Sequence, residues 1–583
     1  MKKTKIICTL GPATDDDQVL ADMIKAGMDV ARFNFSHGDY DAQSKRLEQL
    51  VRVREAQGVP VATLLDTKGP EIRTGDFEDP DGVVIHKGDT FTLTTKKCLG
   101  DAKHCYVNYP GLVDDVKVGT SILINDGLIA MEVTELRRDE IVCRVTDGGL
   151  LTNKKGVNVP DISLNMPYLS PADMQDLEFG ASHDFDFIAA SFVRTAGDVI
   201  YLRNFCQALG WNDVRIIAKI ENMEGVNNID AIIEEADGIM VARGDMGVEI
   251  DFTEIPAIQK DMIAQCVACG KPVITATQML DSMIENPRPT RAEITDVANA
   301  IYDGTGAVML SGETAAGKYP VEALKAMATI AETTEADSSF DSLVHHSGTD
   351  NSRLNISAAV GHAACTTATD IGASAIITAS KSGETARLLS RFRPDTQIIA
   401  CVLDETTRCQ LNVYRGVTPL LMDYATSTDE LISMSVAKAK SAGLVQDGDL
   451  VVVTAGVPVG ISGTTNMIKV HMVGDSLLAG VGIGSHNAKG EVCVCRNAAE
   501  AAKKFKPGQI LVVPFTTNDM LPFMREAAGI ITEEAGTNSH SAIVGLTLDK
   551  AVIVGATNAT RTLKDGMTIS MDCVRGVVQA MAK

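Results

Sequence analysis

The sequence predicts an α/β protein built around a (β/α)8 barrel. Its 583 residues are too many for one hydrophobic core, so several domains are expected. Hydrophobic residues make up 45% and charged residues 22%, which is an ordinary globular balance. Short runs rich in β-branched residues alternate with helical stretches, as a (β/α)8 barrel requires. The eight candidate strands are residues 5–9, 29–34, 60–66, 187–191, 215–220, 238–241, 272–276 and 307–310.

The spacing of these strands has one large gap, between residues 66 and 187. Within it, Gly, Asp and Pro turns separate short alternating runs at residues 89–94, 121–124 and 140–145. This pattern predicts a small β domain inserted after the third barrel strand. We therefore expect a discontinuous barrel domain, residues 1–69 and 167–340, that is interrupted by the insertion, residues 70–166.

The strand and helix pattern restarts after about residue 340. Candidate strands at residues 375–379, 397–402, 450–454 and 468–473 predict a second α/β domain over residues 341–473. The Gly-rich stretch of residues 478–485 indicates a linker or a strand at a sheet edge. Residues 484–583 are expected to form a further compact unit with its own strands.

Charge and composition exclude several classes of function. The formal net charge is −23 and no basic face is visible, which argues against nucleic-acid binding. No apolar run is long enough to span a membrane, and residues 1–8 resemble a first strand more than a signal peptide. The 13 cysteines are odd in number and scattered, so a reducing cytoplasm is expected. Cys266 and Cys269 form a single CxxC, which we interpret as structural thiols.

Polar residues follow five of the eight predicted barrel strands. Catalytic residues of such barrels lie at the C-terminal ends of the strands. Glu221 and Asp245 offer hard oxygen ligands for Mg²⁺, and Arg32 and Lys219 are cations suited to a phosphoryl group in transfer. A set of oxygen ligands that could hold a monovalent cation is formed by Asn34, Ser36, Asp66 and Thr67. The convergence of these types on one rim predicts an active site.

Six sequence runs resemble the pyruvate kinase family, in order and at consistent spacing over about residues 1–473. They are IICTLGPA (6–13), ARFNFSHG (31–38), DTKGPEIR (66–73), IIAKIEN (216–222), NPRPTRAE (286–293) and LSGETA (310–315). The resemblance implies transfer of the phosphoryl group of phosphoenolpyruvate to ADP, giving pyruvate and ATP. It also implies Mg²⁺ (or Mn²⁺) and K⁺ as cofactors, a cytoplasmic location and a homotetramer. The inserted β domain would be a small β-barrel lid over the nucleotide.

The resemblance also assigns roles to single residues. Lys219 would stabilise the transferring phosphoryl group, Arg32 would bind the substrate phosphate, and Glu221 and Asp245 would hold Mg²⁺. Gly244, Asp245 and Thr277 would contact the substrate, with Thr277 near the proton delivered to the enolate. The K⁺ ligands would be Asn34, Ser36, Asp66 and Thr67. The nucleotide would be contacted by Asn34, His37, Arg73 and Lys155.

A second candidate site precedes an amphipathic stretch in the second α/β domain. In the resembling family the corresponding loop binds a sugar-phosphate effector, and residues 457–466 supply a second wall. Glu384 places a negative charge in this loop, which argues against a doubly phosphorylated effector. A monophosphate or a nucleotide is favoured instead, and the absence of any effector remains a third alternative. The candidate residues are Ser380, Lys381, Ser382, Gly383 and Thr385.

The last hundred residues contain a third resemblance. The run EAGTNSHSAIV (534–544) resembles the phosphohistidine domain of phosphoenolpyruvate-utilising enzymes, with His540 at the position of the phosphate carrier. It departs from that pattern at Ala535 and Asn538. Direct transfer to ADP needs no histidine carrier, so we expect a structural or interface role, with His540 near a helix start capped by Ser539 or Asn538.

Two other functions remain open at this stage. A metal-dependent aldolase or lyase acting on pyruvate could also place Mg²⁺ on barrel-strand carboxylates, although it would lack the lid and the nucleotide contacts. A catalytically inactive scaffold that senses a metabolite would require the loss of a site residue. The residues at issue are all present: Arg32, Lys219, Glu221, Asp245 and Thr277.

Overall fold

The computed structural model describes residues 2–337, 355–457, 465–474 and 476–581. Its contacts gather into two compact units. The first contains residues 1–355, 381–393 and 402–421, and the second contains residues 356–380, 394–401 and 422–583. Among the described residues, no helix is both long and apolar enough to cross a lipid bilayer.

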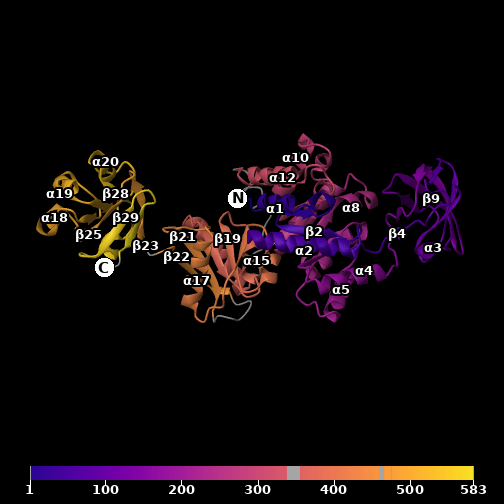
Figure 1. Cartoon of the computed structure of the whole chain (residues 1–583), viewed down its shortest axis with the longest axis horizontal. Helices are drawn as coiled ribbons and strands as arrows, with labels where there is room; N and C mark the ends of the chain where they lie inside the picture. The colour runs from indigo at the N-terminus through magenta and orange to yellow at the C-terminus, as the bar shows by residue number, and fades with distance from the viewer. Residues whose placement is uncertain (1, 338–354, 458–464, 475, 582–583) are drawn as a thin grey trace. The chain divides into compact units, whose positions relative to one another are not determined.

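The first unit contains a closed barrel of eight parallel strands in the order β1-β17-β16-β15-β14-β13-β3-β2 (Figure 1). The predicted (β/α)8 barrel is therefore confirmed, and each strand begins and ends within two residues of the expected positions. The strands are β1 (Lys5–Thr9), β2 (Val30–Asn34), β3 (Ala62–Asp66), β13 (Phe187–Ala190), β14 (Arg215–Ile220), β15 (Gly238–Ala242), β16 (Val273–Ala276) and β17 (Ala307–Leu310).

Helices connect the barrel strands and cover the outside of the barrel. Several of them begin where a side chain caps the free backbone amides, as in the reciprocal pair of Ser170 and Asp173 and the pair of Thr290 and Glu293. The main helices are α1 (Asp17–Lys25), α2 (Tyr40–Gln57), α4 (Pro171–Ser182), α5 (Ala196–Ala208), α6 (Met223–Asn227), α7 (Ile229–Glu235), α8 (Arg243–Glu249), α9 (Ile255–Cys269), α10 (Arg291–Tyr302) and α12 (Pro320–Glu335).

The strand register brings the C-terminal ends of neighbouring strands level with one another. Asn34 lies opposite Asp66, and Asp66 lies opposite Ala189 on its other side. Farther round the barrel, Lys219 lies opposite Met240 and Ala242 lies opposite Ala276. Residues that follow these strands must therefore meet at one rim.

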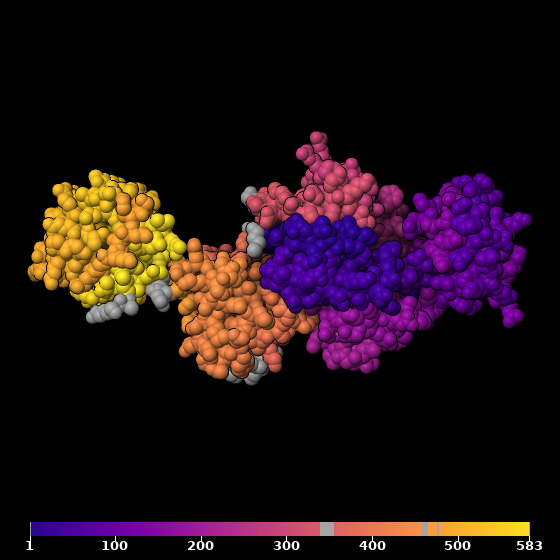
Figure 2. All heavy atoms as spheres, viewed as in Figure 1, coloured from indigo at the N-terminus to yellow at the C-terminus, as the bar shows by residue number. Residues whose placement is uncertain are grey.

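The insertion between β3 and β13 folds into a curled sheet. Seven strands follow the order β4-β12-β8-β9-β10-β6-β7, and a bridge between Thr74 and Val107 joins the two edges, as a small β-barrel requires. Buried residues such as Phe91 and Ile122 fill its interior. Figure 2 shows the outer surface of the insertion as a compact violet body. The elements are β4 (Ile72–Arg73), β5 (Val83–Ile85), β6 (Thr90–Thr94), β7 (His104–Tyr106), α3 (Leu112–Asp115), β8 (Ser121–Ile124), β9 (Ile129–Arg137), β10 (Glu140–Asp147), β11 (Gly149–Leu151) and β12 (Gly156–Asn158).

A second α/β sheet has the strand order β20-β19-β18-β21-β22. Four of its strands were predicted, and β20 was missed because Pro419 interrupts its apolar run. The elements are α14 (Ile356–Asp370), β18 (Ala375–Ala379), α15 (Glu384–Arg391), β19 (Gln397–Val402), α16 (Glu405–Gln410), β20 (Val417–Leu421), α17 (Thr428–Ser441), β21 (Leu450–Gly456) and β22 (Thr465–Met472).

The C-terminal sheet has eight strands in the order β23-β30-β29-β25-β26-β27-β28-β24. The Gly-rich stretch supplies the two outermost strands, so the strand-edge interpretation is correct. Alternate residues such as Ile510 and Leu511 pack into separate cores on the two faces of the sheet. The elements are β23 (Ser476–Ala479), β24 (Val481–Ile483), β25 (Ala488–Val494), α18 (Ala498–Lys504), β26 (Ile510–Val513), α19 (Leu521–Glu526), β27 (Gly529–Thr532), α20 (His540–Thr547), β28 (Ala551–Val554), α21 (Ala559–Thr562), β29 (Thr568–Asp572) and β30 (Val577–Ala580).

Candidate active site

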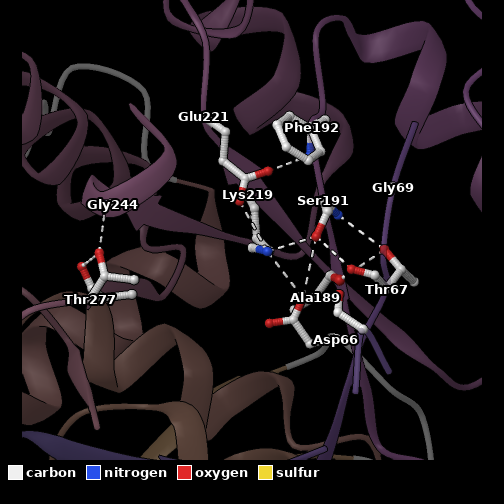
Figure 3. Close-up of polar contacts among 12 residues, drawn as sticks. Asp66, Thr67, Gly69, Ala189, Ser191, Phe192, Lys219, Glu221, Gly244 and Thr277 are labelled. Atoms are coloured by element: carbon white, nitrogen blue, oxygen red, sulfur yellow. Dashed lines mark hydrogen bonds and ion pairs between the residues drawn. The ribbon is translucent and has the colours of Figure 1, made fainter. Parts of the chain in front are cut away.

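The Lys219 ammonium lies at the centre of the polar cluster at the C-terminal rim of the barrel (Figure 3). It donates to Ser191 Oγ at 2.6 Å and to Asp66 Oδ1 at 3.1 Å, and it lies 3.0 Å from Glu221 Oε1 as an ion pair. Burial alone would lower the pKa of Lys219, but Asp66 and Glu221 hold that pKa above its ordinary value. Lys219 is therefore a buried side chain that remains charged.

Asp66 joins the two cations of the site. Its Oδ1 accepts from Lys219, and its Oδ2 pairs with Arg32 Nε. Arg32 also donates to Thr9 Oγ1 at 2.9 Å, which fixes the second side of the guanidinium. Burial would raise the pKa of Asp66, but Arg32 and Lys219 lower it below its ordinary value. The carboxylate therefore remains ionised while it is almost completely buried.

Glu221 is a fully buried carboxyl whose two oxygens have different surroundings. Oε2 accepts from the backbone amide of Phe192 at 2.6 Å, whereas Oε1 faces the Lys219 ammonium at 3.0 Å. Burial raises the pKa of Glu221 to about 8, with Lys219 opposing and the charge of Asp245 adding to the increase. A bound divalent cation would favour the ionised form of this carboxyl, so the residues present fit Mg²⁺.

Thr277 lies just beyond β16 in a strained backbone conformation. Its φ is 66°, which is unusual for a β-branched residue, and the next residue, Gln278, has a φ of 54°. The Thr277 hydroxyl accepts from Gly244 N at 2.7 Å and donates to Ala276 O at 2.6 Å. Strain that is maintained by such contacts often marks a functional position.

The predicted monovalent-cation ligands also gather at this rim. Asn34 Oδ1 accepts from Ser36 N at 3.0 Å, and Phe35 N donates to Asp66 O at 3.1 Å. Thr67 follows Asp66 directly, and its carbonyl accepts from Ser191 Oγ at 2.7 Å. This donor set consists of neutral and singly charged oxygens, which suits a weakly binding cation such as K⁺.

A cavity of about 620 Å³ lies beside the cluster and is lined by both barrel and insertion. Among the predicted site residues, Arg73, Lys155 and Asp245 line it, whereas Asn34 and His37 do not. Arg73 pairs with Glu71 at 2.7 Å and donates to Lys154 O at 2.9 Å. The cavity thus brings two cations from the insertion near a carboxylate of the barrel rim.

The second candidate site has only part of its expected structure within the described residues. Gly383 precedes α15 with a φ of 73°, Thr385 is buried, and Arg387 contacts both Ser382 O at 2.8 Å and Glu384 Oε2 at 3.0 Å. Of the expected second wall, residues 458–464 lie outside the described residues.

His540 is the first residue of α20, and Ser539 caps that helix by accepting from Ala542 N. Of the two predicted caps, Ser539 is thus the correct one. The imidazole contacts two residues that follow β26: Nδ1 lies 2.7 Å from Thr516 Oγ1, and Nε2 lies 3.0 Å from Asn518 Oδ1. Both ring nitrogens therefore have hydrogen-bond partners.

Sequence reasoning missed two residues of the cluster, Ser191 and Phe192. Ser191 is buried between Lys219 and Thr67, and Phe192, with a φ of 53°, presents its amide to Glu221. A signal was available, because Ser191 directly follows the fourth barrel strand. The polar residues that predict the site come from the ends of strands two, three, five, six and seven, so the end of strand four was left out of the prediction.

Three family models match the chain. The model described as "Pyruvate kinase, barrel domain" matches residues 1–324, and "Pyruvate kinase, alpha/beta domain" matches residues 358–471. The model "PEP-utilising enzyme, mobile domain" matches residues 505–576, which confirms the resemblance seen around His540.

Similar proteins extend over the full chain. A pyruvate kinase of Bacillus licheniformis is 47% identical and one of Geobacillus stearothermophilus is 48% identical, each covering 99% of this chain and at least 98% of the relative. The crystal structure of a pyruvate kinase from Cryptosporidium parvum has a TM-score of 0.76 at 38% identity, covering 81% of this chain and 96% of that one. The chain therefore belongs to the pyruvate kinase family and is a phosphotransferase.

Proposed function

We propose that the chain transfers the phosphoryl group of phosphoenolpyruvate to ADP, with Mg²⁺ (or Mn²⁺) and K⁺, in the cytoplasm. The observation that carries this proposal is the cluster of Lys219, Asp66, Arg32 and Glu221 at the barrel rim. A buried cation, Lys219, and a half-buried one, Arg32, are held by one carboxylate and form a preorganised positive field, which is the main requirement of phosphoryl transfer.

In this proposal Lys219 and Arg32 act on different parts of the reaction. Arg32 binds the phosphate of phosphoenolpyruvate before reaction, since its guanidinium presents planar donors to phosphate oxygens. Lys219 stabilises the negative charge on the phosphoryl group as its bond to the enol oxygen breaks and its bond to ADP forms. Both side chains are held by Asp66, so little reorganisation is needed when the substrate binds.

Glu221 and Asp245 would hold the divalent cation, and Asn34, Ser36, Asp66 and Thr67 would hold K⁺. When bound, the divalent cation supplies charge neutralisation for substrate oxygens. The feature of this chain that supports the assignment is the fully buried Glu221 carboxyl. Its Oε1 is paired with the Lys219 ammonium at 3.0 Å and can still accept a second partner, such as a metal ion.

The substrate carboxylate would lie against Gly244 N and the Thr277 hydroxyl. In the structure the Gly244 amide donates to the Thr277 hydroxyl at 2.7 Å, so the amide already points toward the position that a substrate carboxylate oxygen would take. After transfer, the enolate takes up a proton, and the Thr277 hydroxyl is placed to hold that proton near the site. The nucleotide would occupy the cavity lined by Arg73 and Lys155, with Asn34 and His37 as further contacts.

Assembly and regulation extend the proposal. We infer a homotetramer, and a monophosphate or nucleotide effector at Ser380, Lys381, Ser382, Gly383 and Thr385. Arg387 supports this choice of effector only in part, because it already neutralises Glu384 at 3.0 Å. Because Arg387 is paired with Glu384, less positive charge is left in this loop for a phosphorylated ligand. An effector with one phosphate group therefore fits the loop better than one with two.

The two competing functions differ from this proposal in one assay. A coupled assay for pyruvate should detect product only when phosphoenolpyruvate and ADP are both present. Pyruvate formed without ADP would indicate a lyase or an aldolase. The absence of pyruvate under both conditions would indicate a catalytically inactive scaffold.

Lys219→Met tests the assigned catalytic role. Phosphoryl transfer should lose about 3–4 kcal/mol of transition-state stabilisation, or a factor of about 10²–10³ in kcat, because one preorganised charge is removed. Proton exchange into pyruvate should fall less, since Thr277 and the divalent cation remain. Both reactions are measured on the same preparation, and equal losses in both would remove Lys219 from this role.

K⁺ dependence tests the monovalent-cation ligands. Activity should be low in a buffer whose ionic strength is set by tetramethylammonium chloride, and it should recover on addition of K⁺. Glu71 cannot replace a cation, whereas an ammonium at that position could, so Glu71→Lys should retain more activity without K⁺. Full activity of the unmodified enzyme without any small monovalent cation would contradict the assignment.

For the C-terminal domain we propose a structural or interface role. Both nitrogens of His540 are engaged by Thr516 and Asn518, which supports positioning of the ring more than phosphate transfer. Deletion of residues 476–583, which removes the whole C-terminal sheet with its edge strands β23 and β24, should leave kcat largely unchanged and lower stability or alter regulation. Stoichiometric, acid-labile label at His540 from labelled phosphoenolpyruvate, lost in His540→Ala together with activity, would overturn this role.

A further inference from the structure

Three arginines gather at a small cavity near the N-terminal end of the barrel strands. The cavity measures about 30 Å³ and is lined by Arg391, Arg393 and Arg415, together with Val273 at the start of β16 and Gly306 just before β17. All of these residues belong to the first compact unit. The active-site cluster lies at the C-terminal ends of the same strands, so this cavity is a separate feature.

Arg391 and Arg393 each carry a donor that the described residues do not satisfy. Arg391 Nε and Arg393 Nη1 are buried without a hydrogen-bond partner. Arg393 donates from Nη2 to Gly304 O, and the Arg391 guanidinium lies 6.0 Å from the Phe392 ring. Arginine carries five N–H donors, so Arg391 and Arg393 retain donor capacity directed at or near the cavity.

Negative charge near the cluster is limited. Glu335 Oε1 lies 3.9 Å from Arg415 Nη2, and this oxygen also accepts from Thr4 N and Thr4 Oγ1 at 2.6 Å. Lys271, another cation of the lining, donates its ammonium to three carbonyl oxygens at the end of α7. Glu335 is thus a partner of Arg415, whereas among the described residues neither Arg391 nor Arg393 pairs with a carboxylate.

The cost of this arrangement is electrostatic. A cation that is removed from water without a counter-charge is strongly disfavoured. Burial and the neighbouring charge of Arg415 lower the pKa of Arg393 to about 9, which reflects the same excess of positive charge. A water molecule could accept hydrogen bonds here, but it would not neutralise the cluster.

One glycine allows Arg391 to reach its position. A Cβ at Gly270, where φ is 76°, would lie 2.7 Å from Arg391 Cδ and would displace that side chain. The absence of a side chain at Gly270 therefore lets Arg391 lie against the base of the barrel.

We propose that this cavity binds a small inorganic anion of the size of chloride, held by Arg391 Nε and Arg393 Nη1. A water molecule needs about 10–15 Å³ of cavity volume, so a cavity of about 30 Å³ can hold one small ion or one or two water molecules. A tetrahedral oxyanion with four oxygens would not be enclosed. The bound anion neutralises the cluster and thereby stabilises the packing of α15 and residues 413–415 on the barrel.

Crystals of the full chain soaked in sodium bromide give the direct test. The proposal predicts an anomalous peak at the bromine edge within hydrogen-bond distance of Arg391 Nε and Arg393 Nη1. A water molecule or no density at that place, while other bromide sites are filled, would overturn it.

Thermal unfolding gives the test in solution. At constant ionic strength set by sodium gluconate, Tm should rise with chloride in a saturable manner. Arg391→Met should lose the saturable part, and it should still fold because the Arg391 side chain is only half-buried and its Nε makes no hydrogen bond among the described residues. Arg138→Met, which removes an exposed arginine of the insertion, should retain it. Activity at saturating substrate should be unchanged in both variants.

Two results in solution would contradict the proposal. If unmodified protein and Arg391→Met have the same chloride dependence, the effect is general screening of charge. If bromide occupies the site in crystals but chloride gives no saturable change in Tm, the site holds an adventitious ion only. Neither result bears on phosphoryl transfer, which is measured separately.

Discussion

The candidate active site depends on one buried carboxylate, Asp66. It is ionised at the end of β3 and pairs with Lys219 on one oxygen and with Arg32 on the other. Two cations within reach of each other inside a protein would repel each other and pay a large desolvation cost without it. Their combined attraction in turn lowers the pKa of Asp66. The three residues are therefore stable only as a set, which fixes their geometry before any substrate arrives.

The barrel supplies the rigidity that this set needs. Asp66 and Lys219 come from β3 and β14, which lie on either side of β13, and Ser191 at the end of β13 connects them. Positions that carry backbone strain, Phe192 and Thr277, occur where an amide or a hydroxyl must face the rim. Tightly packed strands below the rim can maintain such strain, whereas an exposed loop would relax it.

Much of the barrel and its rim could be predicted because the information is local. Strand periodicity located all eight strands, and the residues that follow them identified Lys219, Asp66 and Glu221. The features that could not be predicted from the sequence depend on long-range contacts or on an unusual local sequence. The role of Ser191 emerges only when β13 is placed between β3 and β14, and β20 was hidden by Pro419. The bridge from Thr74 to Val107 that closes the inserted sheet, and the arginine cluster at Gly270, join segments that are far apart in sequence.

Asp66→Asn is the most direct test of this account, because an amide keeps the shape of the side chain and removes its charge. The steady-state rate of phosphoryl transfer should fall about 100-fold or more, because Lys219 and Arg32 would lose the carboxylate that positions them, and the loss of one preorganised electrostatic group costs about 10²–10³ in kcat. Asp186→Asn is the matched control: it neutralises another buried aspartate, one that binds Thr63 and has a pKa raised to about 6 by burial. Its rate should stay within a few-fold of the unmodified enzyme. Near-normal transfer in Asp66→Asn, with Thr277 and Glu221 unchanged, would contradict the central role of this carboxylate.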